Sequence, residues 1–106
     1  MANITRLTKS QERLINLLCD NAATLGRNWY EKNKSKYSDD LYKAYRYLRD
    51  KYFKRHDLLQ EAVDMLSPTD RTLFDKLYAE FDESSKTVLV ASLHDEFYVD
   101  EIMDAI

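Results

Sequence analysis

The chain has 106 residues, of which 44% are hydrophobic and 33% are charged, and its formal net charge at pH 7 is −3. Its length suits one domain with its own core, and its composition is too apolar for a disordered chain. With only one Gly and one Pro, the chain is short of the residues that hairpins and bulges require. We therefore predict an all-α fold, a compact single-domain bundle of five or six helices over residues 1–106.

The single cysteine, Cys19, cannot form an internal disulfide, and secreted domains of this size usually carry several cysteines. No apolar signal core follows Met1, and no window approaches the ~18 to 20 apolar residues of a membrane span. We expect a cytoplasmic protein with no membrane partner.

The first predicted helix covers residues 9–33. Thr8 and Gln11 have the spacing of a capping box. Gly26 lies inside this helix, where glycine costs roughly 0.5 to 1 kcal/mol relative to alanine, so it marks either a kink or the close approach of another helix. The expected inward stripe is Leu14, Leu18, Ala22, Leu25 and Trp29.

A second helix is predicted from Ser38-Asp39-Asp40, whose oxygens can cap its first turn, to about Arg55. Asp57 followed by Gln60 gives another capping signal, so Leu58–Leu66 is either a separate short helix or a continuation. The inward residues are expected to be Leu41, Tyr45, Leu48 and Tyr52, followed by Leu59, Val63 and Leu66.

Ser67-Pro68-Thr69-Asp70 is the clearest helix start, with a serine cap and proline at the first helical position. In the helix that follows, Arg71 and Asp75 are expected to pair at helical spacing. Its inward face is expected to be Leu73, Phe74, Leu77, Tyr78 and Phe81.

Ser84 or Ser85 is expected to cap a further helix, and residues 100–106 are predicted to form a short terminal one. The expected core residues of these two helices are Leu89, Leu93 and Phe97, with Ile102, Met103 and Ile106 available for docking.

Charge is divided unevenly along the chain. Residues 1–56 hold thirteen Lys/Arg and six Asp/Glu, whereas residues 57–106 hold three and thirteen, so the formal charges are +7 and −10. Either the two halves pack together and neutralise each other, or the division indicates charged partners.

The predicted second helix has a stripe that is both aromatic and cationic. Its members recur at helical spacing and are Tyr42, Arg46, Arg49 and Phe53, with Lys43, Tyr47 and Lys54 continuing the basic character. Arginine and tyrosine are enriched at binding hot spots, and basic residues among aromatics also suit phosphate contacts and base stacking. We expect these residues to contact a macromolecular partner. The alternatives are packing on neighbouring helices, with arginine stacked on tyrosine, or a homodimer interface.

An acidic line on the following segment is formed by Asp57, Glu61 and Asp64. Carboxylates spaced along a helix can imitate the phosphates of a nucleic acid, so this line is the alternative binding surface if the partner is basic. A solvated helix face has the same pattern.

No catalytic, cofactor or metal site is expected. His56 and His94 lie in no metal-ligand motif, and the chain has no glycine-rich loop that could hold a phosphate.

The segment Leu66–Arg71, with Leu73 and Phe74, resembles the opening of the helix-turn-helix region of bacterial sigma-type factors. Where that family presents a basic recognition helix, this chain has Asp82-Glu83 and Asp95-Glu96, which would repel phosphates. No residue role is therefore transferred from it.

We expect a small non-enzymatic interaction protein that binds and modulates, most simply by inhibiting, a larger protein or nucleoprotein. Phages and mobile elements encode small helical proteins of this kind against host machinery. The alternative is a nucleic-acid-binding protein that uses the basic, Tyr-rich segment 32–56.

Overall fold

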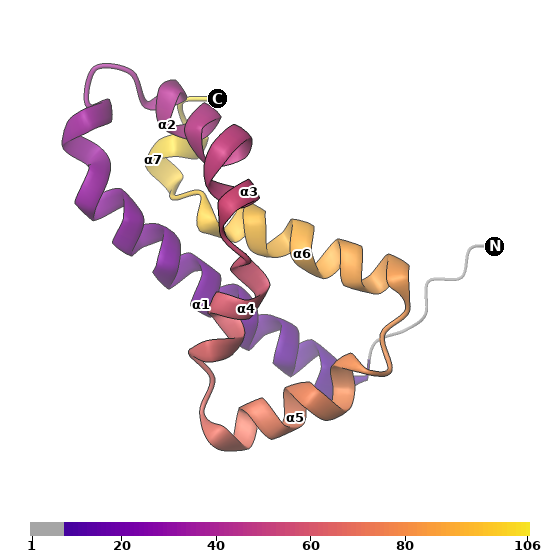
Figure 1. Cartoon of the computed structure of the whole chain (residues 1–106). Helices are drawn as coiled ribbons and strands as arrows, with labels where there is room; N and C mark the ends of the chain where they lie inside the picture. Colours follow the sequence, from indigo (N-terminus) through magenta and orange to yellow (C-terminus); the bar gives the residue numbers. More distant parts are fainter. Residues whose placement is uncertain (1–7) are drawn as a thin grey trace.

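Helix α1, Lys9–Asn33, is the longest element and packs against α4, α5 and α6 (Figure 1). The computed structural model describes residues 8–106. The segment Met1–Arg6, which we read for a targeting signal, lies outside the described residues. Thr8 Oγ1 accepts a hydrogen bond from the Gln11 N–H at 3.1 Å, and Gln11 Oε1 accepts one from the Thr8 N–H at 2.9 Å. The predicted capping box and helix range are thus confirmed.

A single rod follows the 3₁₀ turn η1 (Lys34–Tyr37). It consists of α2 (Leu41–Tyr47), the π-helical turn η2 (Leu48–Tyr52) and α3 (Phe53–Arg55). The side chain of Asp40 caps the rod by accepting from the Tyr42 N–H at 3.1 Å.

The rod ends because His56 is extended, with φ −126° and ψ 131°. Asp57 then caps α4 (Leu58–Asp64) by accepting from the Gln60 N–H. The separate short helix, and not a continuation, is therefore the correct alternative.

Two further helix starts follow. Ser67 caps α5 (Pro68–Tyr78), with Pro68 at the first helical position, as predicted. The expected cap of the next helix was wrong, because α6 (Glu83–Phe97) begins one turn earlier than a Ser85 cap would allow. The Asp82 carboxylate accepts from the Ser85 N–H at 2.7 Å, so Ser85 is the third helical residue and not the cap.

The buried residues form one core between α1 and the other helices. On α1, Leu14, Leu18 and Ala22 are buried as expected, but Leu25 and Trp29 are only half-buried and Tyr30 is buried. On the rod, Ala44 is buried beside Leu48.

Other predicted inward positions hold in part. Leu89, Leu93 and Phe97 are buried, as are Phe74, Leu77 and Phe81, whereas Leu73 and Tyr78 are half-buried. On α4 the buried residues are Leu58, Ala62 and Val63, with Leu59 and Leu66 half-buried. The terminal helix α7 (Asp100–Met103) is shorter than predicted, and only Ile102 docks, since Met103 and Ile106 are exposed.

Gly26 marks a close helix approach. A β-carbon at this position would lie 2.7 Å from the carbonyl carbon of Phe97, and still closer to its oxygen. The backbone of α6 therefore occupies the space that any side chain on this residue would need. Of our two alternatives, the close approach is correct.

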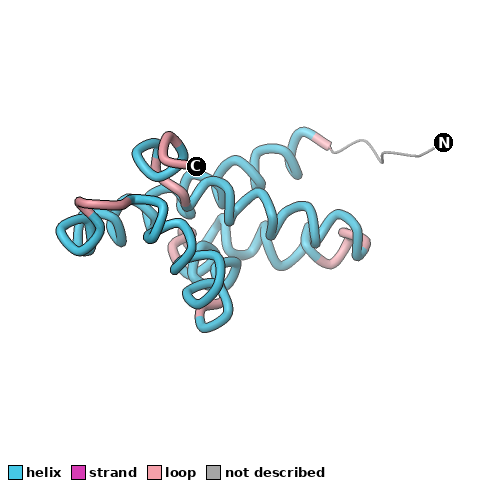
Figure 2. Tube along the Cα trace, turned by 90° about the horizontal axis from the view of Figure 1, so that it is seen from above, coloured by secondary structure: helices cyan, strands magenta, loops and turns pink. Residues whose placement is uncertain are grey.

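The all-α fold is confirmed. Six helices form the bundle when α2, η2 and α3 are counted as one rod, and the part of the chain that the structure describes contains no strand (Figure 2). The bundle is flattened, with extents of 44 × 37 × 22 Å. Within residues 8–106, no helix is both long and apolar enough to cross a membrane.

Candidate functional site

The outer side of the rod carries three of the four residues that we expected in the aromatic and cationic stripe. Tyr42, Arg46 and Arg49 are all exposed, and we call them the exposed stripe. The guanidinium of Arg46 lies 5.5 Å from the Tyr42 ring centroid, and that of Arg49 lies 5.3 Å from the Tyr45 centroid. The Tyr42 and Tyr45 rings stack at 5.7 Å. Cations and rings are thus ordered together while remaining open to solvent.

Arg49 is neutralised locally. Its Nε and Nη2 atoms donate to the two carboxylate oxygens of Asp50 at 2.7 and 3.0 Å. This bidentate ion pair raises the pKa of Arg49 and lowers the pKa of Asp50. Among the described residues, no salt bridge involves Arg46, so Arg46 is the free cation of the exposed stripe.

Phe53 lies away from the exposed stripe. Its ring stacks on His94 of α6 at 4.2 Å with an interplanar angle of 3°, and it is half-buried. The expected stripe assumed 3.6 residues per turn throughout, but the π-helical turn η2 adds a residue and turns Phe53 toward the core. The exposed stripe therefore ends at Arg49, inside η2.

The flanking residues divide into two groups. Lys43 and Lys54 are exposed. Tyr47 is half-buried on the α1 side of the rod, where its ring stacks on Trp29 at 6.0 Å. Trp29 also contacts the rings of Tyr37 and Tyr52.

Each member of the alternative acidic line has a local contact. Asp57 caps α4, and the Glu61 carboxylate lies 3.0 Å from His56 Nδ1. Asp64 accepts from Gln60 Nε2 at 2.8 Å and lies 3.6 Å from Arg71 Nη1. Arg71 also pairs with Asp75 at 3.6 Å, as predicted. These contacts hold the acidic line in place within the fold.

Within residues 8–106, two ion pairs between Arg and acidic side chains join the two charged halves, and His56 with Glu61 makes a third contact between them. Arg13 Nη2 lies 3.9 Å from Asp70 Oδ1. Arg27 donates two hydrogen bonds, from Nη1 and Nη2, to the carboxylate oxygens of Glu101 at 3.0 and 3.1 Å. The exposed stripe takes part in neither pair. The halves are therefore neither fully separate nor fully neutralised against each other.

Tyr98 is a central residue that sequence reasoning did not single out. Its ring packs on Tyr45 at 5.1 Å and on Phe53 at 5.6 Å. Burial raises the pKa of Tyr98 to about 12, with Tyr45 and Asp95 adding to the rise and Arg49 opposing it. Its hydroxyl is therefore neutral at ordinary pH.

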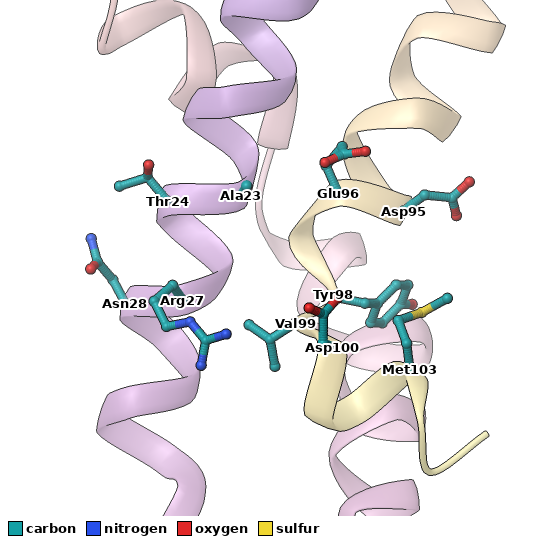
Figure 3. A pocket seen from close by; sticks show the side chains of 10 residues that line it. All are labelled: Ala23, Thr24, Arg27, Asn28, Asp95, Glu96, Tyr98, Val99, Asp100 and Met103. Carbon is teal, nitrogen blue, oxygen red and sulfur yellow. The ribbon is translucent and has the colours of Figure 1, made fainter.

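Tyr98 also lines a groove of about 680 Å³ between α1 and the α6–α7 junction (Figure 3). Figure 3 shows α1 on one side of this groove and the end of α6 with α7 on the other. We call three carboxylates on the second side the acidic end, namely Asp95, Glu96 and Asp100. In the sequence, the acidic end is visible only as the pairs Asp95-Glu96 and Asp100-Glu101. No local pattern indicates that they share a groove with Tyr98, which packs on Tyr45.

Within residues 8–106, no three His, Cys, Asp or Glu side chains come together as a metal site. Comparisons with protein-family models, with curated proteins and with solved structures found no match.

Proposed function

We propose that this chain is a non-enzymatic interaction protein that binds a larger protein or nucleoprotein through the exposed stripe. Binding modulates the partner, most simply by blocking one of its functional surfaces. Small helical inhibitors that phages and mobile elements direct against host machinery act in this way. The observation that carries the proposal is the preformed stack of Arg46 on Tyr42, which is exposed and has no ion-pair partner among the described residues.

The preformed stack favours binding for an entropic reason. A free arginine and a free tyrosine each lose rotamer freedom when a partner immobilises them. Here the cation–π contact restricts both side chains before a partner arrives. Because Tyr42 keeps 40% of its surface exposed, a partner can still bury much of its ring.

A photo-reactive aromatic amino acid in place of Tyr42, which keeps a ring beside the Arg46 guanidinium, tests this proposal in cells of the source organism. We expect one crosslinked product with a chain of different sequence, and we expect it to be lost when Arg46→Glu is added. The matched control carries the same group at Val88, which is 64% exposed on α6. Equal capture from both positions, or capture unaffected by Arg46→Glu, contradicts the proposal.

With the partner purified, Tyr42→Ala and Arg46→Ala are each expected to weaken binding by at least about 30-fold, the scale of a hot-spot residue. Lys76→Ala is the matched control, because Lys76 is exposed on α5 at the other end of the molecule (Figure 1). An equal loss in Lys76→Ala would show that the weakening is not specific to the exposed stripe.

Nucleic-acid binding by segment 32–56 is the second candidate. Its support is a set of exposed Lys and Arg side chains without a salt bridge in the described part of the chain, namely Lys32, Lys36, Lys43, Arg46, Lys51, Lys54 and Arg55. Against it, the rings of Tyr37, Tyr45, Tyr47 and Tyr52 are packed on other aromatic rings. Few faces therefore remain for stacking on bases.

Fluorescence polarisation with single-stranded DNA and RNA distinguishes the two candidates. Binding that weakens steeply with salt and falls in Lys43→Glu and Lys54→Glu supports nucleic-acid binding. Lack of binding at low salt eliminates it and leaves the protein partner.

A further inference from the structure

Contacting aromatic rings link the cation Arg46 to the acidic end, and we call this series of side chains the tyrosine face. Arg46 lies on Tyr42 at 5.5 Å, Tyr42 stacks on Tyr45 at 5.7 Å, and Tyr45 packs on Tyr98 at 5.1 Å. Asp95 and Tyr98 line the same groove. The ion pair of Arg49 with Asp50, which is neutral as a whole, lies beside Tyr45. The tyrosine face therefore runs from the cation Arg46 through aromatic rings to the anions of the groove.

The charges at both ends are compensated only in part within the fold, because Arg46 interacts with Asp50, and Asp100 with Arg27, at longer range than a salt bridge. In the part of the chain that the structure describes, no salt bridge involves Arg46 or any residue of the acidic end. Arg27 lines the groove but is already neutralised, since it lies 3.0 Å from Glu101 and 3.7 Å from Glu31. A partner with a cation opposite Asp95 and an anion opposite Arg46 would compensate both ends.

We propose that this partner is a second copy of the same chain, bound around a two-fold axis that passes near the tyrosines. A two-fold rotation exchanges the ends of the face, so that Arg46 of each copy meets Asp95 of the partner subunit while the Tyr42 and Tyr98 regions meet at the centre. Charge complementarity selects this antiparallel arrangement, because a parallel one would bring like charges together. The aromatic centre, with Tyr42 exposed, supplies the apolar area.

The inference goes beyond the proposed function and does not require it. It bears on the same residues, however, because the dimer covers Tyr42 and Arg46. Dimerisation and binding of a larger partner through the exposed stripe are therefore mutually exclusive.

Sedimentation and light scattering of the purified full chain over a dilution series measure this association. We expect the mass of two chains at high concentration and a return to one chain at high salt, because salt screens the paired charges. Arg46→Glu and Asp95→Arg are each expected to remain monomeric, since each places two like-charge pairs in the interface. An equimolar mixture of the two variants is expected to restore the mass of two chains, because both pairs again have opposite signs.

Lys76→Glu and Glu80→Arg are the matched controls. They make the same charge changes at exposed positions on and just after α5, far from the rod (Figure 1), and are expected to dimerise like the unmodified chain. Circular dichroism checks that every variant is folded.

Three results overturn the dimer: a monomer at all concentrations, a dimer that survives both charge reversals, or a mixture that stays monomeric. The proposed function is judged separately by whether the crosslink at Tyr42 captures a chain of different sequence, since capture of a second copy alone would support only the dimer. A chain that is monomeric yet captures its partner there would disprove only the dimer.

Discussion

Gly26 of α1 and Phe97 of α6 approach so closely that the two helices touch through their backbones. A β-carbon on Gly26 would lie 2.7 Å from the carbonyl carbon of Phe97 and 2.9 Å from its Cα. Because these are backbone atoms of a helix end, they cannot move aside as the tip of a side chain can. This contact brings the end of α6, and with it Tyr98 and the groove, against α1.

Gly26→Ala is therefore expected to destabilise the fold by about 2 kcal/mol, because an overpacking cost of about 3 kcal/mol exceeds the gain of about 1 kcal/mol in helix propensity. Chemical denaturation measures the change. Thr24→Ala, at an exposed position two residues earlier in α1, serves as the control and is expected to change stability by less than about 0.5 kcal/mol. Equal stability of the two variants would disprove the close approach.

Asp82→Ala is expected to lower the midpoint of thermal unfolding by several degrees, because the Ser85 N–H loses its acceptor at the start of α6. Ser84→Ala is expected to leave the midpoint unchanged, since Ser84 is not the cap. A larger decrease of the midpoint in Ser84→Ala than in Asp82→Ala would indicate that the serine caps α6.

The stability of the fold is expected to fall as pH drops below 6.5, the ordinary pKa of histidine. Burial lowers the pKa of His94, although Asp95 opposes the shift. Since the folded state then binds protons less readily than the unfolded state, stability is full above the unfolded pKa and is lost as pH falls through the folded value.

His94→Gln is expected to reduce this pH dependence below pH 6.5, as measured by denaturation at several pH values. The Phe53 ring, stacked on the imidazole at 4.2 Å, covers one of its faces and contributes to its burial. If the slope of the free energy of unfolding against pH is unchanged in the variant, the pH dependence belongs to other groups.

Tyr47→Ala is expected to destabilise the fold by about 1 to 2 kcal/mol and to shift the fluorescence of Trp29 to longer wavelength. The substitution removes the ring that stacks on Trp29 at 6.0 Å and admits water to the indole. Lys43→Ala, four residues earlier and exposed, is expected to change neither quantity. Comparison of these two variants distinguishes the packing role of Tyr47 from the partner contact that we propose for the exposed residues near it.

Helix starts were predictable where one local signal stood alone. Thr8 with Gln11 and Ser67 with Pro68 each offer a single arrangement of side chain and backbone, and the structure has both. Asp82, Ser84 and Ser85 offer competing caps within four residues. The choice among them depends on where the chain enters the helix after Phe81, which is buried in the core.

The exposed stripe was predictable as far as the helix stayed regular. Tyr42 and Arg46 lie on one side of α2 as a period of 3.6 residues requires. Phe53 was misplaced because no residue type in Leu48–Tyr52 announces a π-helical turn. Tyr98 could not be found from sequence, since its meeting with Tyr45 joins residues far apart in the chain.

The π-helical turn gives the rod an unusual tolerance to changes in length. Deleting one exposed residue there, such as Lys51, would let the turn close into a regular α-helix, with Tyr52 and Phe53 keeping their present neighbours. The same deletion in α1 or α6 would rotate every later side chain by about 100° and remove it from its contacts. Shortened relatives of this chain would therefore be expected to have lost their residue inside Leu48–Tyr52.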